Sequence, residues 1–124
     1  MNGMEAFEIL RRVEDRLIRV TVKVKGKDTR MAQKVRGRSV IIPGFKRAGF
    51  FVHNSMGNRW RCSDGLCGLL IGFPARTASK AVASAVESLA KYCQGSEKEF
   101  EKRLEGQPHV NTLPIYDPIK GEGE

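Results

Sequence analysis

Residues 50–94 have the sequence FFVHNSMGNRWRCSDGLCGLLIGFPARTASKAVASAVESLAKYCQ, in which short apolar runs and turn residues precede a helical pattern. The expected strands are residues 50–52, 59–62 and 66–73. Turns between them are predicted at Met56–Asn58 and at Asp64–Gly65, because Asp-Gly between apolar runs is a strong hairpin signal. Pro74 ends the last strand. This stretch therefore predicts an antiparallel sheet.

A long helix follows these strands. Thr77 or Ser79 provides an N-terminal cap, and Gly95 is the type of residue that ends a helix. The apolar positions between them recur at steps of three and four: Ala78, Ala81, Val82, Ala85, Val86, Leu89 and Tyr92. We expect a helix over residues 77–94, packed on the sheet through Val82, Val86 and Leu89.

This order of three strands and a capped helix resembles the small β-β-β-α modules of certain phage integrase arms and plant transcription factors. The resemblance covers residues 50–94 and rests on element order. It implies DNA binding, with the face of the sheet entering the major groove.

The first forty residues predict a helix and then strands. Phe7, Leu10, Val13 and Leu17 have helical spacing, so a helix is expected from Met4 to about Leu17. From Ile18 the period changes to two, which predicts a half-buried strand to Lys25 with a cationic outer face. Residues 29–38 contain few apolar side chains and indicate either a loop-like connection or a short second strand, and residues 39–42 a further strand.

The C-terminal part is more polar. Ser96 and Glu99 have capping-box spacing and predict a short helix that ends at Gly106. The fold class is therefore α+β: an N-terminal helix, an antiparallel sheet of four to five strands, a long helix packed on the sheet, a short C-terminal helix and an extended tail. We expect one domain over residues 1–106 and an extended or flexible tail over residues 107–124.

The cationic residues are concentrated in one part of the chain. Residues 19–47 contain ten Lys or Arg and a single acid, Asp28, in a protein whose formal net charge is +8. Such a segment predicts a polyanionic partner. The candidate nucleic-acid-binding residues are Arg19, Lys23, Lys25, Lys27, Arg30, Lys34, Arg36, Arg38, Lys46, Arg47, Arg59 and Arg61. The hypothesis is a DNA- or RNA-binding protein that contacts phosphates.

Two other interpretations of the same charges stay open. The basic surface is simply solvated, or it binds an acidic protein partner, as an inhibitor, immunity factor or assembly subunit would. Trp60, between Arg59 and Arg61, is either buried beneath a cationic face or exposed as a platform for base stacking. A single tryptophan in a small domain favours burial.

No pattern in the sequence indicates catalysis. Cys62, Cys67 and Cys93 lack the paired spacing of a structural zinc site, so free thiols and no metal are expected. His53 and His109 lie outside any recognisable catalytic motif, and we expect neither a cofactor nor an enzyme. The absence of a long apolar run and of a signal-like start predicts a cytoplasmic protein with no membrane partner. The alanine-rich face of residues 78–90 suits either the domain's own sheet or a twofold partner, which leaves a homodimer open.

Overall fold

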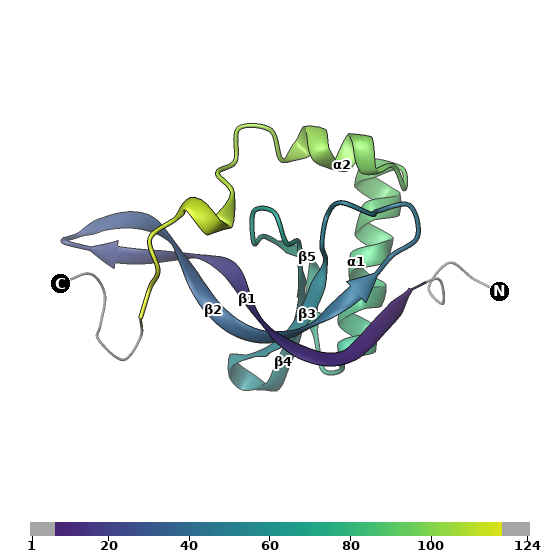
Figure 1. The fold of residues 1–124 in the computed structure, drawn as a ribbon, viewed down its shortest axis with the longest axis horizontal. Coiled ribbons are helices and arrows are strands. Elements are labelled where there is room, and N and C mark those ends of the chain that lie inside the picture. The colour runs from purple at the N-terminus through teal and green to yellow at the C-terminus, as the bar shows by residue number, and fades with distance from the viewer. Residues whose placement is uncertain (1–6, 118–124) are drawn as a thin grey trace.

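The computed structural model describes residues 7–117 and contains a five-stranded antiparallel sheet (Figure 1). The strands follow one another in space as they do in sequence, in the order β1-β2-β3-β4-β5. Their bounds are β1 Glu8–Val24, β2 Lys27–Ile41, β3 Phe51–Ser55, β4 Arg59–Ser63 and β5 Leu70–Ala75. A short 3-10 turn, η2 (Met56–Asn58), joins β3 to β4. The predicted antiparallel sheet is thus confirmed, with five strands.

Two helices follow the sheet. The long helix α1 (Ala78–Cys93) is capped by Thr77, whose side chain accepts a hydrogen bond from the backbone N–H of Lys80 at 3.1 Å. The short helix α2 (Glu97–Arg103) is capped in the same way by Ser96. Both helices and both caps match the sequence prediction, except that α2 ends at Arg103 and not at Gly106. After α2, a second 3-10 turn, η3, spans Val110–Thr112.

The predicted N-terminal helix is wrong, because residues 8–24 form strand β1; its expected first residues, 4–6, lie outside the described range. The reason is a bulge. Ile9 pairs with Val40 and Val13 with Arg38, so three residues of β1 lie opposite one residue of β2. The bulge adds two residues, so Ile9 and Val13 stay on one face, and the four-residue step from Val13 to Leu17 fits a strand as well as a helix. Leu10 lies within the bulge, outside the alternation of faces, and its position completes the spacing that imitates a helix.

Residues 29–38, for which the sequence indicated either a loop-like connection or a short second strand, form the central part of strand β2. The turn that joins β1 to β2 contains Lys25 and Gly26, and both have positive φ, 52° and 80°. A two-residue type I′ turn requires this geometry, and it fits the twist of the flanking strands. Strands β1 and β2 are each much longer than β3, β4 or β5. The hairpin that they form therefore projects beyond the rest of the sheet (Figure 1).

The hydrophobic core lies between α1 and strands β3 to β5. Val52 and Cys62 face α1 from the sheet, and Val82 and Leu89 face the sheet from α1; all four are at most 3% exposed. Val86 packs against the same cluster. The alanine-rich face of α1 is therefore used by the domain's own sheet.

Strand β5 begins later than predicted, at Leu70 instead of Leu66. The cause is Asp64, whose buried carboxylate accepts hydrogen bonds from the backbone N–H groups of Leu66, Cys67 and Leu69 at 2.6 to 2.9 Å. These bonds hold residues 64–69 in a compact loop and take up N–H groups that a strand would need.

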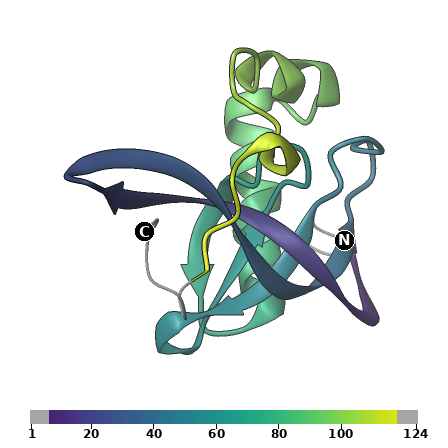
Figure 2. The ribbon, with the colours of Figure 1, turned by 60° about the vertical axis from the view of Figure 1, so that its left-hand side comes forward.

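Residues 107–117 pack against the β1–β2 hairpin (Figure 2). Ala32 of β2 donates its backbone N–H to Pro114 O and accepts from Tyr116 N, at 2.8 and 2.7 Å. Arg19 of β1 donates to the Gln107 side chain at 2.7 Å. The domain boundary at Gly106 stays a prediction. Within residues 7–117, neither helix has the length and apolar composition needed to cross a bilayer.

Candidate nucleic-acid interface

The β1–β2 hairpin carries eight of the twelve candidate cations, six of them on one of its two faces. Side chains alternate between the faces of a strand, and paired residues of antiparallel strands share a face. The pairs Arg19↔Ala32, Thr21↔Arg30 and Leu17↔Lys34 place residues of the two strands together. The residues of this face, called here the cationic hairpin face, are Arg19, Lys23, Arg30, Lys34, Arg36 and Arg38. From Arg30 to Arg38 it extends about 27 Å at the usual rise per strand residue.

Some of these cations have partners within the protein. Lys23 pairs with Asp28 at 3.2 Å and Arg36 with Asp15 at 3.1 Å, and both pairs are largely exposed. Exposed pairs of this kind contribute little to stability and exchange readily for another anion. Arg38 donates through Nε to the Leu10 backbone oxygen at 2.7 Å.

Four further cations are not engaged by neighbouring groups. Within the part of the chain that the structure describes, these side chains form neither a hydrogen bond nor an ion pair: Lys25, Lys27, Arg30 and Lys34. Lys25 and Lys27 lie at the tip of the hairpin, and all four are exposed. Their ammonium and guanidinium groups are available to an external anion.

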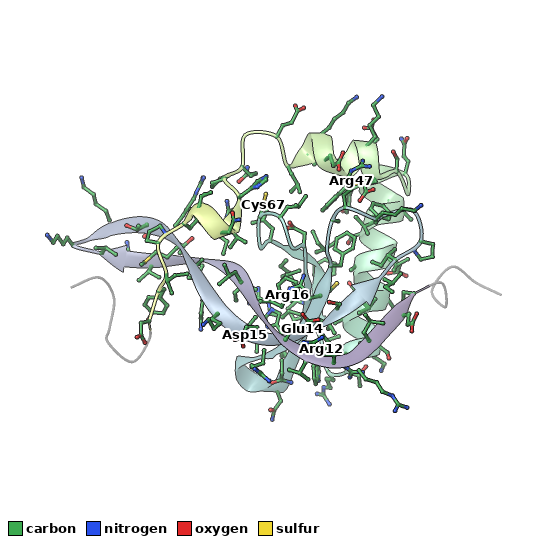
Figure 3. The ribbon with its side chains drawn as sticks, in the orientation of Figure 1. Arg12, Glu14, Asp15, Arg16, Arg47 and Cys67 are labelled. Atoms are coloured by element: carbon green, nitrogen blue, oxygen red, sulfur yellow. The ribbon has the colours of Figure 1, made fainter. Side chains whose placement is uncertain are left out.

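Lys46 and Arg47 lie elsewhere, in the loop between β2 and β3. The backbone N–H groups of Lys46, Arg47 and Ala48 donate to the Glu97 carboxylate at 2.7 to 3.1 Å. The Arg47 guanidinium also makes two bonds to Glu101, at 2.8 and 3.0 Å, and these lower the pKa of Glu101. Figure 3 shows Arg47 beside α2, apart from Asp15 and Arg16 on β1. Arg47 therefore joins the loop to α2 and lies apart from the cationic hairpin face.

Arg59 and Arg61 lie on the sheet face opposite α1, since Cys62 between Arg61 and Ser63 points into the α1 core. Trp60 alternates with them and packs, half-buried, against that core. Of the two interpretations of Trp60, the structure matches the one that places it on the core side of the sheet, beneath cationic side chains, with the indole half-buried and not fully buried. The twelve sequence-predicted residues thus lie in three places: on the β1–β2 hairpin, in the loop between β2 and β3 that contacts α2, and on strand β4.

The sheet face opposite α1 contains residues that the sequence did not single out as a site. Phe51 and His53 of β3 are buried there, at 0% and 1% exposure. Arg16 covers Phe51, with its guanidinium carbon 4.6 Å from the ring centroid, and donates to Ser39 Oγ and to the Gly49 oxygen at 2.8 Å each. This part of the face is closed, unlike the open sheet face that the resemblance to β-β-β-α modules implied.

Beside Phe51, a cavity of about 430 Å³ opens between the hairpin and strands β3 and β4. It is lined by Ile18, Val20, Gln33, Val35, His53, Asn54, Ser55 and Arg61. Burial lowers the pKa of His53, with a smaller contribution from the charge of Arg61. His53 is therefore neutral at neutral pH. In the sequence, the alternation of Ile18 and Val20 indicated an apolar wall on this side of the hairpin. No pattern in the sequence indicated that His53 is buried.

The three cysteines are buried, and none of them forms a disulfide. Burial, followed by the charge of Asp64, raises the pKa of the Cys62 thiol to about 12. Over residues 7–117 no group of three or more His, Cys, Asp or Glu side chains lies together as metal ligands would.

Comparison of the chain with protein families, with curated proteins and with solved structures finds no match. The fold and the distribution of charged and buried polar groups are therefore the basis for functional inference. They define a small α+β domain with a projecting cationic hairpin.

Proposed function

We propose that this protein binds DNA or RNA, without catalysis, through phosphate contacts on the cationic hairpin face. The observation that carries the proposal is the β1–β2 register, which gathers six Lys and Arg on one face of a projecting hairpin. The hairpin tip adds Lys25 and Lys27. Cations spread over about 27 Å of strand can contact several successive phosphates.

The proposal predicts a definite salt dependence. Each phosphate contact changes the slope of log affinity against log salt by about −0.7 for a single strand and about −0.9 for duplex DNA. The four unengaged cations alone thus correspond to a slope of about −3 to −4. Lys23 and Arg36 increase the magnitude of the slope if phosphate displaces their carboxylate partners.

Absence of catalysis is part of the proposal. A cysteine nucleophile needs an accessible thiolate, whereas Cys62 is buried with a raised pKa. His53 is buried between strands and hydrogen-bonded to a backbone oxygen, and Asp64 is occupied by three backbone N–H groups.

The test compares two double variants with the same loss of charge. Arg30→Gln/Lys34→Gln removes two unengaged cations from the face, and Arg76→Gln/Lys80→Gln removes two exposed cations outside the hairpin. Fluorescence anisotropy at several salt concentrations should show that the first variant reduces the magnitude of the slope by about 1.4 for a single strand or about 1.8 for a duplex. The control should keep the wild-type slope.

Two results would count against this function. A wild-type protein that binds no nucleic acid near ~0.1 M salt would end the proposal, since steering by exposed cations is still strong there. An unchanged slope in Arg30→Gln/Lys34→Gln would remove the hairpin face from the interface.

The alternative is an acidic protein partner for the same face. Such an interface needs an apolar anchor among its charges. The exposed aromatic side chains among the described residues, Phe73 at 75% and Tyr92 at 54%, lie on β5 and α1. The hairpin exposes only aliphatic side chains of large size, Val13 at 45% and Ile41 at 51%, and Val13 shares the cationic hairpin face through its pairing with Arg38. The lack of an exposed aromatic anchor on this face favours nucleic acid, and Val13 is the side chain that an acidic protein partner would contact. A cytoplasmic location and a homodimer stay predictions, the second tested by sedimentation.

A further inference from the structure

The cavity beside His53 lies on the other side of the hairpin from the cationic face. Ile18, Val20, Gln33 and Val35 project into it, whereas the alternate residues Arg19 and Lys34 belong to the cationic face. The hairpin bends across β3 and β4 (Figure 1), so its apolar side forms one wall and the sheet forms the other. With about 430 Å³, the cavity is in the size range of small-molecule sites.

His53 and Arg61 line this cavity, and each has one buried polar atom without a hydrogen-bond partner among the described residues: His53 Nε2 and Arg61 Nε. His53 and Arg61 are directly opposite each other in the β3–β4 register, so the two atoms come from neighbouring side chains on one face. Buried polar groups in folded proteins are nearly always satisfied, and an unpaired one is costly. Because both side chains line one cavity, a ligand bound there satisfies both atoms once the two side chains turn toward it.

The chemistry of the two atoms specifies what this ligand offers. His53 is 1% exposed, and its Nδ1 lies 3.4 Å from the Asn54 carbonyl oxygen, a contact that needs the proton on Nδ1. Nε2 then accepts a hydrogen bond, whereas Arg61 only donates. The ligand must therefore present a donor and an acceptor side by side.

The aliphatic part of the cavity wall disfavours a bare anion. A phosphate would face the aliphatic side chains of Ile18, Val20 and Val35, and it has no proton to give His53 once it is fully ionised. A flat molecule with apolar faces and a polar edge fits both the walls and the two unpaired atoms. Nucleobases have this form, and the edge of each one carries donors and acceptors next to one another.

We propose that this cavity binds one unstacked nucleobase of a single strand, with the base edge on His53 and Arg61 and the base face on Ile18, Val20 and Val35. The inference rests on the proposed function and makes it more specific. Arg59, exposed on the same face of β4, is placed to meet the phosphate of that nucleotide. Single-stranded nucleic acids are commonly recognised through bases held in such pockets.

The opposite placement of cavity and cationic face also selects the kind of nucleic acid. A stiff duplex that lies on the cationic hairpin face cannot deliver a base to the other side of the hairpin, and its bases are stacked and paired. A single strand is flexible enough to cross the hairpin. The protein should therefore prefer single strands to duplexes.

The test uses two oligonucleotides of about twelve nucleotides, within the range of sites on small single-strand-binding domains. One contains all four bases and the other has the same backbone charge without bases. In anisotropy titrations near ~0.1 M salt the intact strand should bind about 10-fold more tightly or better, with the same salt slope. Equal affinities would overturn the base cavity and leave the phosphate interface intact. Failure of both strands to bind would overturn the proposed function as well.

Two variants locate the effect. Val20→Phe fills the cavity, and Val22→Phe makes the same change two residues further along the same face of β1, beyond the residues that line it. Val20→Phe should bind the intact and the abasic strand equally, whereas Val22→Phe should keep the preference for bases. A folded Val20→Phe that retains the preference would overturn the assignment. The wild-type comparison decides the question even if Val20→Phe does not fold.

A free nucleotide carries the same base, so nucleoside monophosphates are titrated in parallel. They lack the additional phosphate contacts and should bind about 100-fold more weakly than the oligonucleotide. Binding of a mononucleotide as tightly as the oligonucleotide would overturn the assignment to a strand.

Discussion

Substitution of Gly72 by Ala should destabilise the protein much more than the same substitution at Gly57, although both glycines have a φ of +77°. A side chain at this φ costs about 1 to 2 kcal/mol at either position. Around Gly57 nothing lies within 4 Å of the added Cβ. At Gly72 the Cβ would meet the backbone N of Ala85 and the backbone C of Ser84 at 2.7 Å each.

These contacts are with the backbone of α1, so they cannot be relieved by rotating a side chain. The helix must move away from β5, and overpacking of this kind typically adds about 1 to 3 kcal/mol. The melting temperature of Gly72→Ala should therefore lie about 4 to 12 °C below that of Gly57→Ala, at roughly 4 °C per kcal/mol for a domain of this size.

The measurement is urea denaturation of both variants and the wild type, followed by circular dichroism, with thermal melts as a second observable. The lower unfolded-chain entropy of alanine is common to the two variants and cancels in the comparison. Equal losses of unfolding free energy at both positions would refute the close approach of α1 to β5.

Three further predictions follow from buried side chains. Leu89→Ala should lower the unfolding free energy by about 2 to 4 kcal/mol, because Leu89 is 3% exposed in the α1 core; denaturant unfolding measures this, and a loss within error of zero would contradict the packing. The free energy of unfolding should fall as the pH is lowered through the ordinary His pKa of 6.5. The reason is that the pKa of His53 is depressed in the folded state, so the unfolded chain binds the proton more readily. In His53→Gln this part of the pH dependence should disappear, and an unchanged pH profile in that variant would disprove the role of His53. Cys62 should resist alkylation at about pH 8 until the protein unfolds, since its thiol has a pKa of about 12; mass spectrometry of native and denatured samples reads this out, and native-state labelling of Cys62 would contradict its burial.

Most elements of residues 50–103 were predictable because their signals are local. Thr77 and Ser96 cap helices within one turn of their own positions, and Asp64 marks a bend within five residues. Strand β1 was predictable over residues 18–24, where the side chains alternate, but not over residues 8–17. In that part Leu10 lies in a bulge that exists only when β2 lies beside it, and its position completes a helical spacing.

The candidate site shows the same division between local and distant causes. The cationic character of residues 19–38 was evident, but which cations share a face depends on register and on the turn at Lys25 and Gly26. Arg47 and its partner Glu101 are brought together by tertiary structure. His53 is buried because the hairpin bends over it, and no neighbour of His53 in the sequence carries that information.

The contact of residues 107–116 with the hairpin has a consequence for how the protein is made. Arg19 and Gln107 are 88 positions apart. At about 5 to 20 residues per second, a ribosome needs about 4 to 18 seconds to produce the chain between them. Once β2 has been made, the hairpin can form, but for the rest of this interval it lacks the backbone bonds of Ala32 to Pro114 and Tyr116. An uncovered strand edge of this kind is prone to pair with other chains, so the newly made hairpin is the segment where we expect chaperone protection to matter most.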